Sequence, residues 1–114
     1  MIDVHVTTSR LGDLMGTLAH PHRLLLVLAL ADGPSDASGL ATAVGISKLG
    51  VTEHLRVLRA NHVVAERREE GRARFELKWP GLIEWLGAGV TFLEGQQAPI
   101  QGRLVELPKI GQTG

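Results

Sequence analysis

The chain has 114 residues, 44% of them hydrophobic, and its formal net charge is zero. This length and composition are typical of one globular domain with a modest core, and they exclude a chain that is disordered throughout. Cysteine is absent, which excludes disulfides, thiolate metal sites and thiol redox sensing. The sequence shows neither a run of about 18 apolar residues nor a secretory signal, so we expect a cytoplasmic protein with no membrane partner.

The charges are distributed unevenly. Residues 47–78 contain eight basic and five acidic residues, a net charge of +3, which leaves −3 for the rest of the chain. Attraction to phosphate is local, because salt screens exposed charges beyond about 10 Å. The local excess therefore favours a nucleic-acid partner more than the neutral total opposes one.

The N-terminal third of the chain predicts an arm followed by two helices. Residues 1–8 alternate between apolar and polar side chains, as in an edge strand or a mobile arm. Thr8 or Ser9 is the expected N-cap of a first helix that ends near Ala19. Pro21 suits the first turn of a second helix, which is apolar nearly all round and is therefore expected to be buried.

The middle of the chain predicts a helix-turn-helix and a β-hairpin. A third helix over Ala37–Val44 is followed by a turn at Gly45 and by a fourth helix that is capped by Ser47 and ends at Ala60. Asn61 stands where a left-handed residue is expected. Two alternating segments on either side of a Glu-Glu-Gly tip then predict a hairpin, or wing. The fold class is mainly α (α+β), a winged helix-turn-helix with about five helices and a two-stranded wing.

The C-terminal part predicts one more helix and a tail. The helix opens at Trp79-Pro80 and runs to about Glu94, and its glycines weaken it in isolation. We expect three regions: an arm over residues 1–8, a winged domain that includes the dimerisation helices over residues 9–94, and an irregular tail over residues 95–114. Within the tail, residues 104–107 are apolar enough to dock.

The fourth helix and the hairpin carry the candidate DNA contacts. Polar and basic side chains lie off the apolar stripe of the helix and on both sides of the wing tip, where they can reach base edges or phosphates. The predicted contacts are Ser47, Lys48, Thr52, Glu53, His54, Arg56, Arg59, Arg67, Arg68, Arg72 and Arg74.

A structural alternative stands beside each of these DNA assignments. Glu53 could accept from a cytosine or pair with Arg56 or Arg59 on the helix surface. His54 could hold the turn as a partly buried side chain. The wing arginines could pair with the neighbouring glutamates on a solvated hairpin.

Three segments together resemble the ArsR/SmtB-type regulators, a family of bacterial winged-helix repressors. They are LAHPHRLLLVLAL, SGLATAVGISKLGVTEHLRVLRANHVV and RREEGRARFEL, and the resemblance covers about residues 11–95. It implies a homodimer that binds double-stranded promoter or operator DNA and places each fourth helix in a major groove. The first and last helices would pair across the two-fold axis. The expected dimerisation residues are Leu11, Leu14, Leu18, Leu82, Leu86 and Val90.

The chain departs from the family pattern at the effector sites. The thiolate motif cannot exist without cysteine, and the last helix offers only Glu84 and Glu94 where zinc and nickel sensors carry Asp and His ligands. We expect no required cofactor. The candidate ligands for a Ni²⁺ or Zn²⁺ effector are Asp3 and His5, which would share one side of an extended arm, together with Glu94.

The sequence contains two further histidines near Pro21, and it leaves two other functions open. His20 and His22 flank Pro21 and are expected to serve as caps or surface residues rather than as ligands. The alternatives to a metal-responsive regulator are a regulator with a non-metal effector and a winged-helix module that binds a protein partner. We do not expect an enzyme, because no nucleophile–base pair, phosphate loop or HExxH-like motif occurs.

Overall fold

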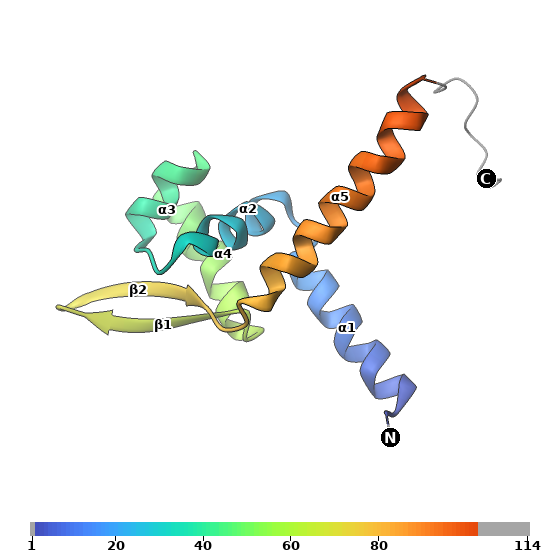
Figure 1. The fold of residues 1–114 in the computed structure, drawn as a ribbon. Helices are drawn as coiled ribbons and strands as arrows, with labels where there is room; N and C mark the ends of the chain where they lie inside the picture. The colour runs from blue at the N-terminus through green and yellow to red at the C-terminus, as the bar shows by residue number, and fades with distance from the viewer. Residues whose placement is uncertain (1, 103–114) are drawn as a thin grey trace. The chain divides into compact units, whose positions relative to one another are not determined.

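The computed structural model describes residues 2–102, with side chains to residue 96. It divides into two units between Pro80 and Gly81. Five helices and an antiparallel hairpin confirm the predicted winged helix-turn-helix (Figure 1). The first unit comprises α1 (Val4–Leu18), α2 (Pro21–Ala29), the short 3-10 helix η1 (Leu30–Asp32), α3 (Ala37–Val44), α4 (Lys48–Ala60), β1 (Val64–Glu69) and β2 (Arg72–Leu77). The second unit is α5 (Gly81–Gly102).

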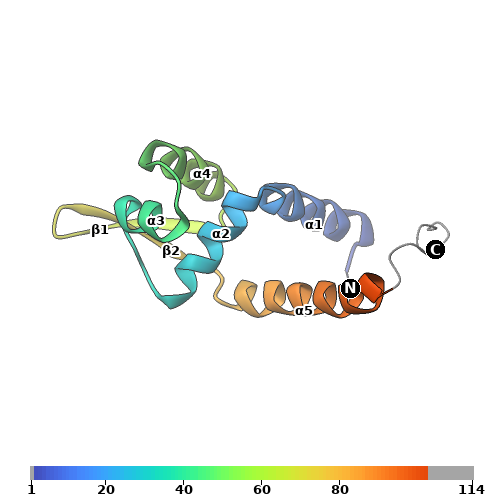
Figure 2. The same cartoon turned by 90° about the horizontal axis from the view of Figure 1, so that it is seen from above.

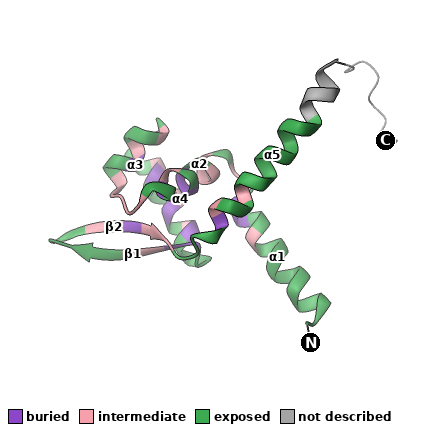
Figure 3. Cartoon of the chain, in the orientation of Figure 1, coloured by how far each residue is buried: buried purple, intermediate pink, exposed green. Residues whose placement is uncertain are grey.

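The core of the first unit lies where α2, α3, α4 and the base of the wing meet, while α1 leads away from this cluster (Figures 1 and 2). Buried residues, purple in Figure 3, occur on these elements. The buried apolar side chains of the first unit are Leu18, Leu26, Val27, Leu30, Leu40, Val51, Leu55, Leu58, Val63, Val64 and Phe75. The prediction that α2 is buried is confirmed on one side only, where Leu26 and Val27 lie in the core, whereas Leu25 and Leu28 are exposed.

The wing is a hairpin with a two-residue turn, and its second strand is hydrogen-bonded to the segment before α3. Glu69 pairs with Arg72, and the turn residues Glu70 and Gly71 have φ of 53° and 78°, as a type I′ turn requires. At the other end, the Ser35 amide donates to the Phe75 carbonyl at 3.0 Å and the Phe75 amide donates back at 2.8 Å. This pair of bonds fixes the wing against the start of α3.

Side-chain caps begin both helices of the helix-turn-helix. The Asp36 carboxylate accepts from the Gly39 amide at 2.7 Å, and the Ser47 hydroxyl accepts from the Gly50 amide at 3.0 Å. Gly45 has φ of 81° and its amide donates to the Ala41 carbonyl. These bonds satisfy backbone groups that helix ends would leave unpaired, and they hold α4 at a defined angle to α3.

The N-terminal arm was predicted wrongly. Helix α1 begins at Val4, and Asp3 is its N-cap, accepting from the His5 and Val6 amides at 2.9 and 3.2 Å. An aspartate that caps two amides stabilises a helix start about as well as Ser9 would have done. The alternating apolar residues that suggested a strand therefore lie on the first turns of a helix.

The end of α4 differs from the prediction by one residue. Asn61 has φ of −102°, whereas His62 adopts the left-handed conformation with φ of 62°. The His62 amide donates to the Arg59 carbonyl and the Val63 amide donates to the Leu58 carbonyl. These two bonds form a Schellman motif, in which the left-handed residue follows the cap.

Helix α5 is longer than predicted. It continues from the expected end at Glu94 to Gly102, so the prediction of an irregular tail was wrong for residues 95–102. The single Gly95 costs about 1 kcal/mol relative to alanine, which does not stop a helix that continues into Gln96. The predicted docking segment, residues 104–107, lies outside the described residues.

Among the described residues, no single helix is long and apolar enough to cross a membrane. The helices Val4–Leu18 and Pro21–Asp32 reach sufficient length and apolar character only when they are taken together, and they are bent by 92° relative to each other.

Candidate nucleic-acid interface

A groove runs between α4, the start of α3 and the wing. Five cationic and two acidic residues line it, so its net charge is positive. The charged lining residues are Lys48, Arg56, Arg59, Arg68, Arg72, Asp36 and Glu66. Thr52 also lines this groove, so the structure brings six of the eleven predicted DNA contacts onto one concave surface.

The cations of the groove differ in their partners. Arg59 pairs with Glu66 across the α4–β1 contact at 2.9 Å, and Arg68 donates to the Gly71 carbonyl at 3.1 Å. Lys48 and Arg72 have no ion pair within the part of the chain that the structure describes. An unpaired cation keeps its full charge for an anionic ligand, so these two residues are the strongest candidates for phosphate contact.

The N-terminal turns of α4 present groups of different kinds. The Thr52 hydroxyl donates to the Lys48 carbonyl at 2.9 Å, which leaves its oxygen to accept and its methyl group to contact an apolar surface. Arg56 forms an ion pair with Glu53, one of the two partners predicted for that glutamate. Ser47 uses its hydroxyl as the N-cap of α4, and neither Ser47 nor Glu53 lines the groove.

Arg67 and Arg74 belong to the other face of the wing. They are cross-strand partners, and Arg67 pairs with Glu69 at 3.2 Å and with Glu76 at 3.5 Å. Arg74 pairs with Glu69 at 3.2 Å and donates to the Pro34 carbonyl at 2.8 Å. Neither lines the groove. For these two arginines the structure shows the alternative arrangement, a hairpin whose arginines pair with neighbouring glutamates.

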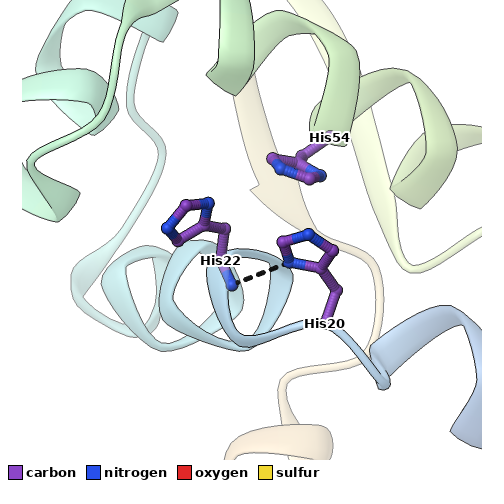
Figure 4. A group of neighbouring side chains, drawn as sticks. All are labelled: His20, His22 and His54. Atoms are coloured by element: carbon purple, nitrogen blue, oxygen red, sulfur yellow. Dashed lines mark hydrogen bonds between the residues drawn. The ribbon is translucent and has the colours of Figure 1, made fainter.

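His54 points away from the groove, toward the start of α2. Its ring lies 4.4 Å from the His20 ring and 5.7 Å from the His22 ring, measured between centroids (Figure 4). Burial lowers the pKa of His54, and the positive charges of His20, Arg23 and His22 lower it further, against a raising effect of Glu53. The side chain therefore belongs to the packing of α4 on α2 rather than to the groove.

The predicted metal ligands are not arranged as expected. Asp3 uses its carboxylate oxygen as the N-cap of α1, and His5 lies in the first turn of the same helix. The extended geometry that would place the two side chains on one side does not exist. Glu94 is exposed on α5.

The structure instead brings together three histidines that the sequence did not connect. His20 is the N-cap of α2, as predicted, and accepts from the His22 amide at 3.1 Å. One ring nitrogen from each of His20, His22 and His54 lies within 4.8 Å of the others. His54 stands 32 residues beyond His22, and only the packing of α2 on α4 could have revealed the cluster.

A helix-turn-helix whose second helix and wing share a cationic groove defines the winged helix-turn-helix class of nucleic-acid-binding domains. Residues 20–65 match the family described as bacterial regulatory protein, arsR family. The matched residues run from the N-cap of α2 to the start of β1, and the match confirms the resemblance inferred from the sequence.

Similar proteins include named repressors. The chain is 33% identical over 66 residues to the biofilm growth-associated repressor of Xylella fastidiosa, a match that covers 58% of each protein. It is 30% identical over 74 residues to the nodulation protein NolR of Rhizobium meliloti, covering 65% of this chain and 61% of that protein. Both matches therefore span less than two thirds of the relative's length. The crystal structure of the transcriptional repressor BigR from Xylella fastidiosa superposes with a TM-score of 0.71 at 28% identity, covering 79% of this chain and 92% of that one.

Proposed function

We propose that this protein is a homodimeric, sequence-specific DNA-binding transcriptional regulator of the arsR type that responds to a divalent metal without thiolate ligands. The observation that carries the proposal is the cationic groove between α4 and the wing. The named repressors among its relatives suggest that DNA binding represses a promoter.

Helix α4 is the proposed reading element. A major groove about 12 Å wide admits one α-helix. Lys48 and Arg56 can donate to guanine edges or phosphates, while Thr52 can accept from a base or contact a thymine methyl group. Arg56 forms an ion pair with Glu53. It can therefore reach a base only if that ion pair opens, or if its guanidinium contacts Glu53 and the base at the same time.

The wing is the proposed backbone contact. Arg68 and Arg72 lie near its tip, and Arg72 has no ion pair among the described residues. Glu70, two residues before Arg72, lies in the turn and has φ of 53°. A carboxylate at the tip repels phosphate, so we expect the wing to lie along the backbone rather than deep in the minor groove.

The proposed dimer rests on exposed apolar surface. Val4, Leu11 and Met15 form a strip along α1, and Trp85 and Phe92 are exposed on α5. Apolar strips on two helices are unusual on a monomer and fit a second copy of the chain. Two recognition helices would then contact half-sites about one helical turn apart.

The effector is proposed to be a cation bound by nitrogen or oxygen donors. The chain has no cysteine, so thiolate ligation is impossible. Imidazole nitrogen is a ligand for Zn²⁺ and Ni²⁺, and the chain contains five histidines.

The test is a titration of the full chain onto fragments of its own promoter at several salt concentrations. Log affinity should fall linearly with log salt. Lys48→Ala or Arg72→Ala should reduce the slope by about 1 for each phosphate that is no longer neutralised, hence about 2 in a dimer. Arg10→Ala is the matched control, because this exposed cation lies on α1 outside the groove. A slope that is flat, or that changes equally in the control, contradicts the proposal.

A further inference from the structure

Three imidazoles from two helices converge between α2 and α4. His20 precedes α2, His22 is its second residue and His54 lies in the middle of α4, and all three are half-buried (Figure 4). We propose that His20, His22 and His54 form a binding site for a divalent transition-metal cation such as Zn²⁺, which would link the two helices.

The dimensions of the cluster fit such an ion after a small adjustment. The nitrogen atoms lie within 4.8 Å of one another. Zn–N bonds of about 2.0–2.1 Å in a tetrahedron place ligand nitrogens about 3.3 Å apart, so no pair needs to close by more than about 1.5 Å. Rotation of partly exposed imidazoles about their side-chain bonds supplies this movement without a change of fold.

The donor set selects the kind of metal. Three neutral imidazoles suit Zn²⁺, Ni²⁺ or Cu²⁺, whereas Ca²⁺ and Mg²⁺ prefer oxygen ligands. Three protein ligands also leave a fourth tetrahedral position for water or a small ligand. Two charges flank the cluster: Arg23, whose guanidinium donates to the Thr17 carbonyl at 2.8 Å, and Glu53, which pairs with Arg56.

The proton on His20 makes metal binding compete with the cap of α2. Its Nδ1 now accepts from the His22 amide at 3.1 Å, so a neutral His20 ring carries its proton on Nε2. A metal on Nδ1 would replace that bond directly. A metal on Nε2 would require the proton to move to Nδ1, which then could no longer accept. Either ligation mode releases the His22 amide, so binding loosens the first turn of α2 while it ties α2 to α4.

This site shares α4 with the DNA groove but uses another side of the helix. Lys48, Thr52 and Arg56 line the groove, whereas His54 faces His20. A cation that holds α2 and α4 in one arrangement changes DNA affinity to the extent that it binds the free and the DNA-bound states unequally. This regulatory consequence rests on the proposed function; the metal site itself does not.

The experiment is a Co²⁺ titration of the full, tag-free chain, followed by competition with Zn²⁺. We expect the visible absorption of tetrahedral Co²⁺ at one equivalent per chain, and its loss when Zn²⁺ is added. His22→Gln and His54→Gln should weaken binding about tenfold or more. His22→Gln is the cleaner variant, because no hydrogen bond involves the His22 side chain among the described residues. Far-ultraviolet circular dichroism confirms that each variant folds.

The matched controls are His62→Gln and His5→Gln, which remove exposed histidines outside the cluster. Both should bind Co²⁺ as the parent does. Unchanged binding in His22→Gln and His54→Gln, or loss of binding in His5→Gln, overturns the site. DNA titrations with a chelator and with Zn²⁺ then test the link to regulation. Equal affinities overturn that link alone, whereas absence of DNA binding under both conditions overturns the proposed function and not the site.

Discussion

His62, just after the C-terminal end of α4, adopts a strained left-handed backbone conformation. A non-glycine residue in the left-handed region costs roughly 1–2 kcal/mol, and histidine is one of the residues that tolerate it best. Its side chain is exposed, so no core packing offsets this cost. The Schellman bonds from the His62 and Val63 amides are what hold the residue there.

His62→Gly should therefore raise the free energy of unfolding by about 0.5–1 kcal/mol, because glycine adopts this conformation without a Cβ clash. Thermal unfolding followed by circular dichroism should show a melting temperature a few degrees higher. Asn61→Gly is the control, since Asn61 has φ of −102° and its side-chain amide donates to the Val57 carbonyl at 2.9 Å. That variant should lose stability, and a gain there would contradict the assignment of the left-handed residue.

At the scale of elements, the arginines on the two faces of the wing have different surroundings. The face that includes Arg68 lines the groove, and the opposite face carries Arg67 and Arg74 in ion pairs with glutamates. Strand alternation separates Arg68 from Arg67 and Arg74, since successive side chains point to opposite sides of a hairpin, whereas Arg72 lines the groove from its position beside the turn. A wing whose arginines are divided between its two faces therefore offers only part of them to DNA.

Arg68→Ala should weaken promoter binding and reduce its salt dependence, whereas Arg67→Ala should change either much less. Both variants remove one arginine from adjacent positions of β1, so they are matched in charge and in strand propensity. Fluorescence anisotropy at two salt concentrations is sufficient to compare them. Equal reductions would show that the outer face also contacts phosphate and that its ion pairs open in the complex.

The helix-turn-helix and wing were readable from the sequence because their signals are local. Gly45, Ser47 and the Glu70-Gly71 turn each act through residues a few positions away. The start of α1 was missed because Asp3 competes with Ser9 as a cap, and sequence alone does not rank two caps. The histidine cluster was missed for a different reason: it depends on the packing of α2 against α4.

At the scale of the whole molecule, the exposed apolar strip of α1 is the feature that a single copy leaves unexplained. Val4, Leu11 and Met15 are 69%, 44% and 54% exposed, respectively. At 100° per residue, positions 4, 11 and 15 fall on one side of the helix, whereas Ser9 falls on the other. Leu18 continues the strip but is only 5% exposed, so less of its side chain is available for the predicted role in dimerisation.

Leu11→Glu should convert the dimer to a monomer, because it places a charge in an apolar interface that cannot pair it. Sedimentation equilibrium measures the change in mass directly. Ser9→Glu adds the same charge on the opposite side of α1 and should leave the dimer intact. Since a monomer keeps only one groove, the slope of log affinity against log salt for Leu11→Glu should fall to about half that of the parent. A Leu11→Glu variant that remains dimeric would place the interface elsewhere, with the exposed side chains of α5 as the next candidates.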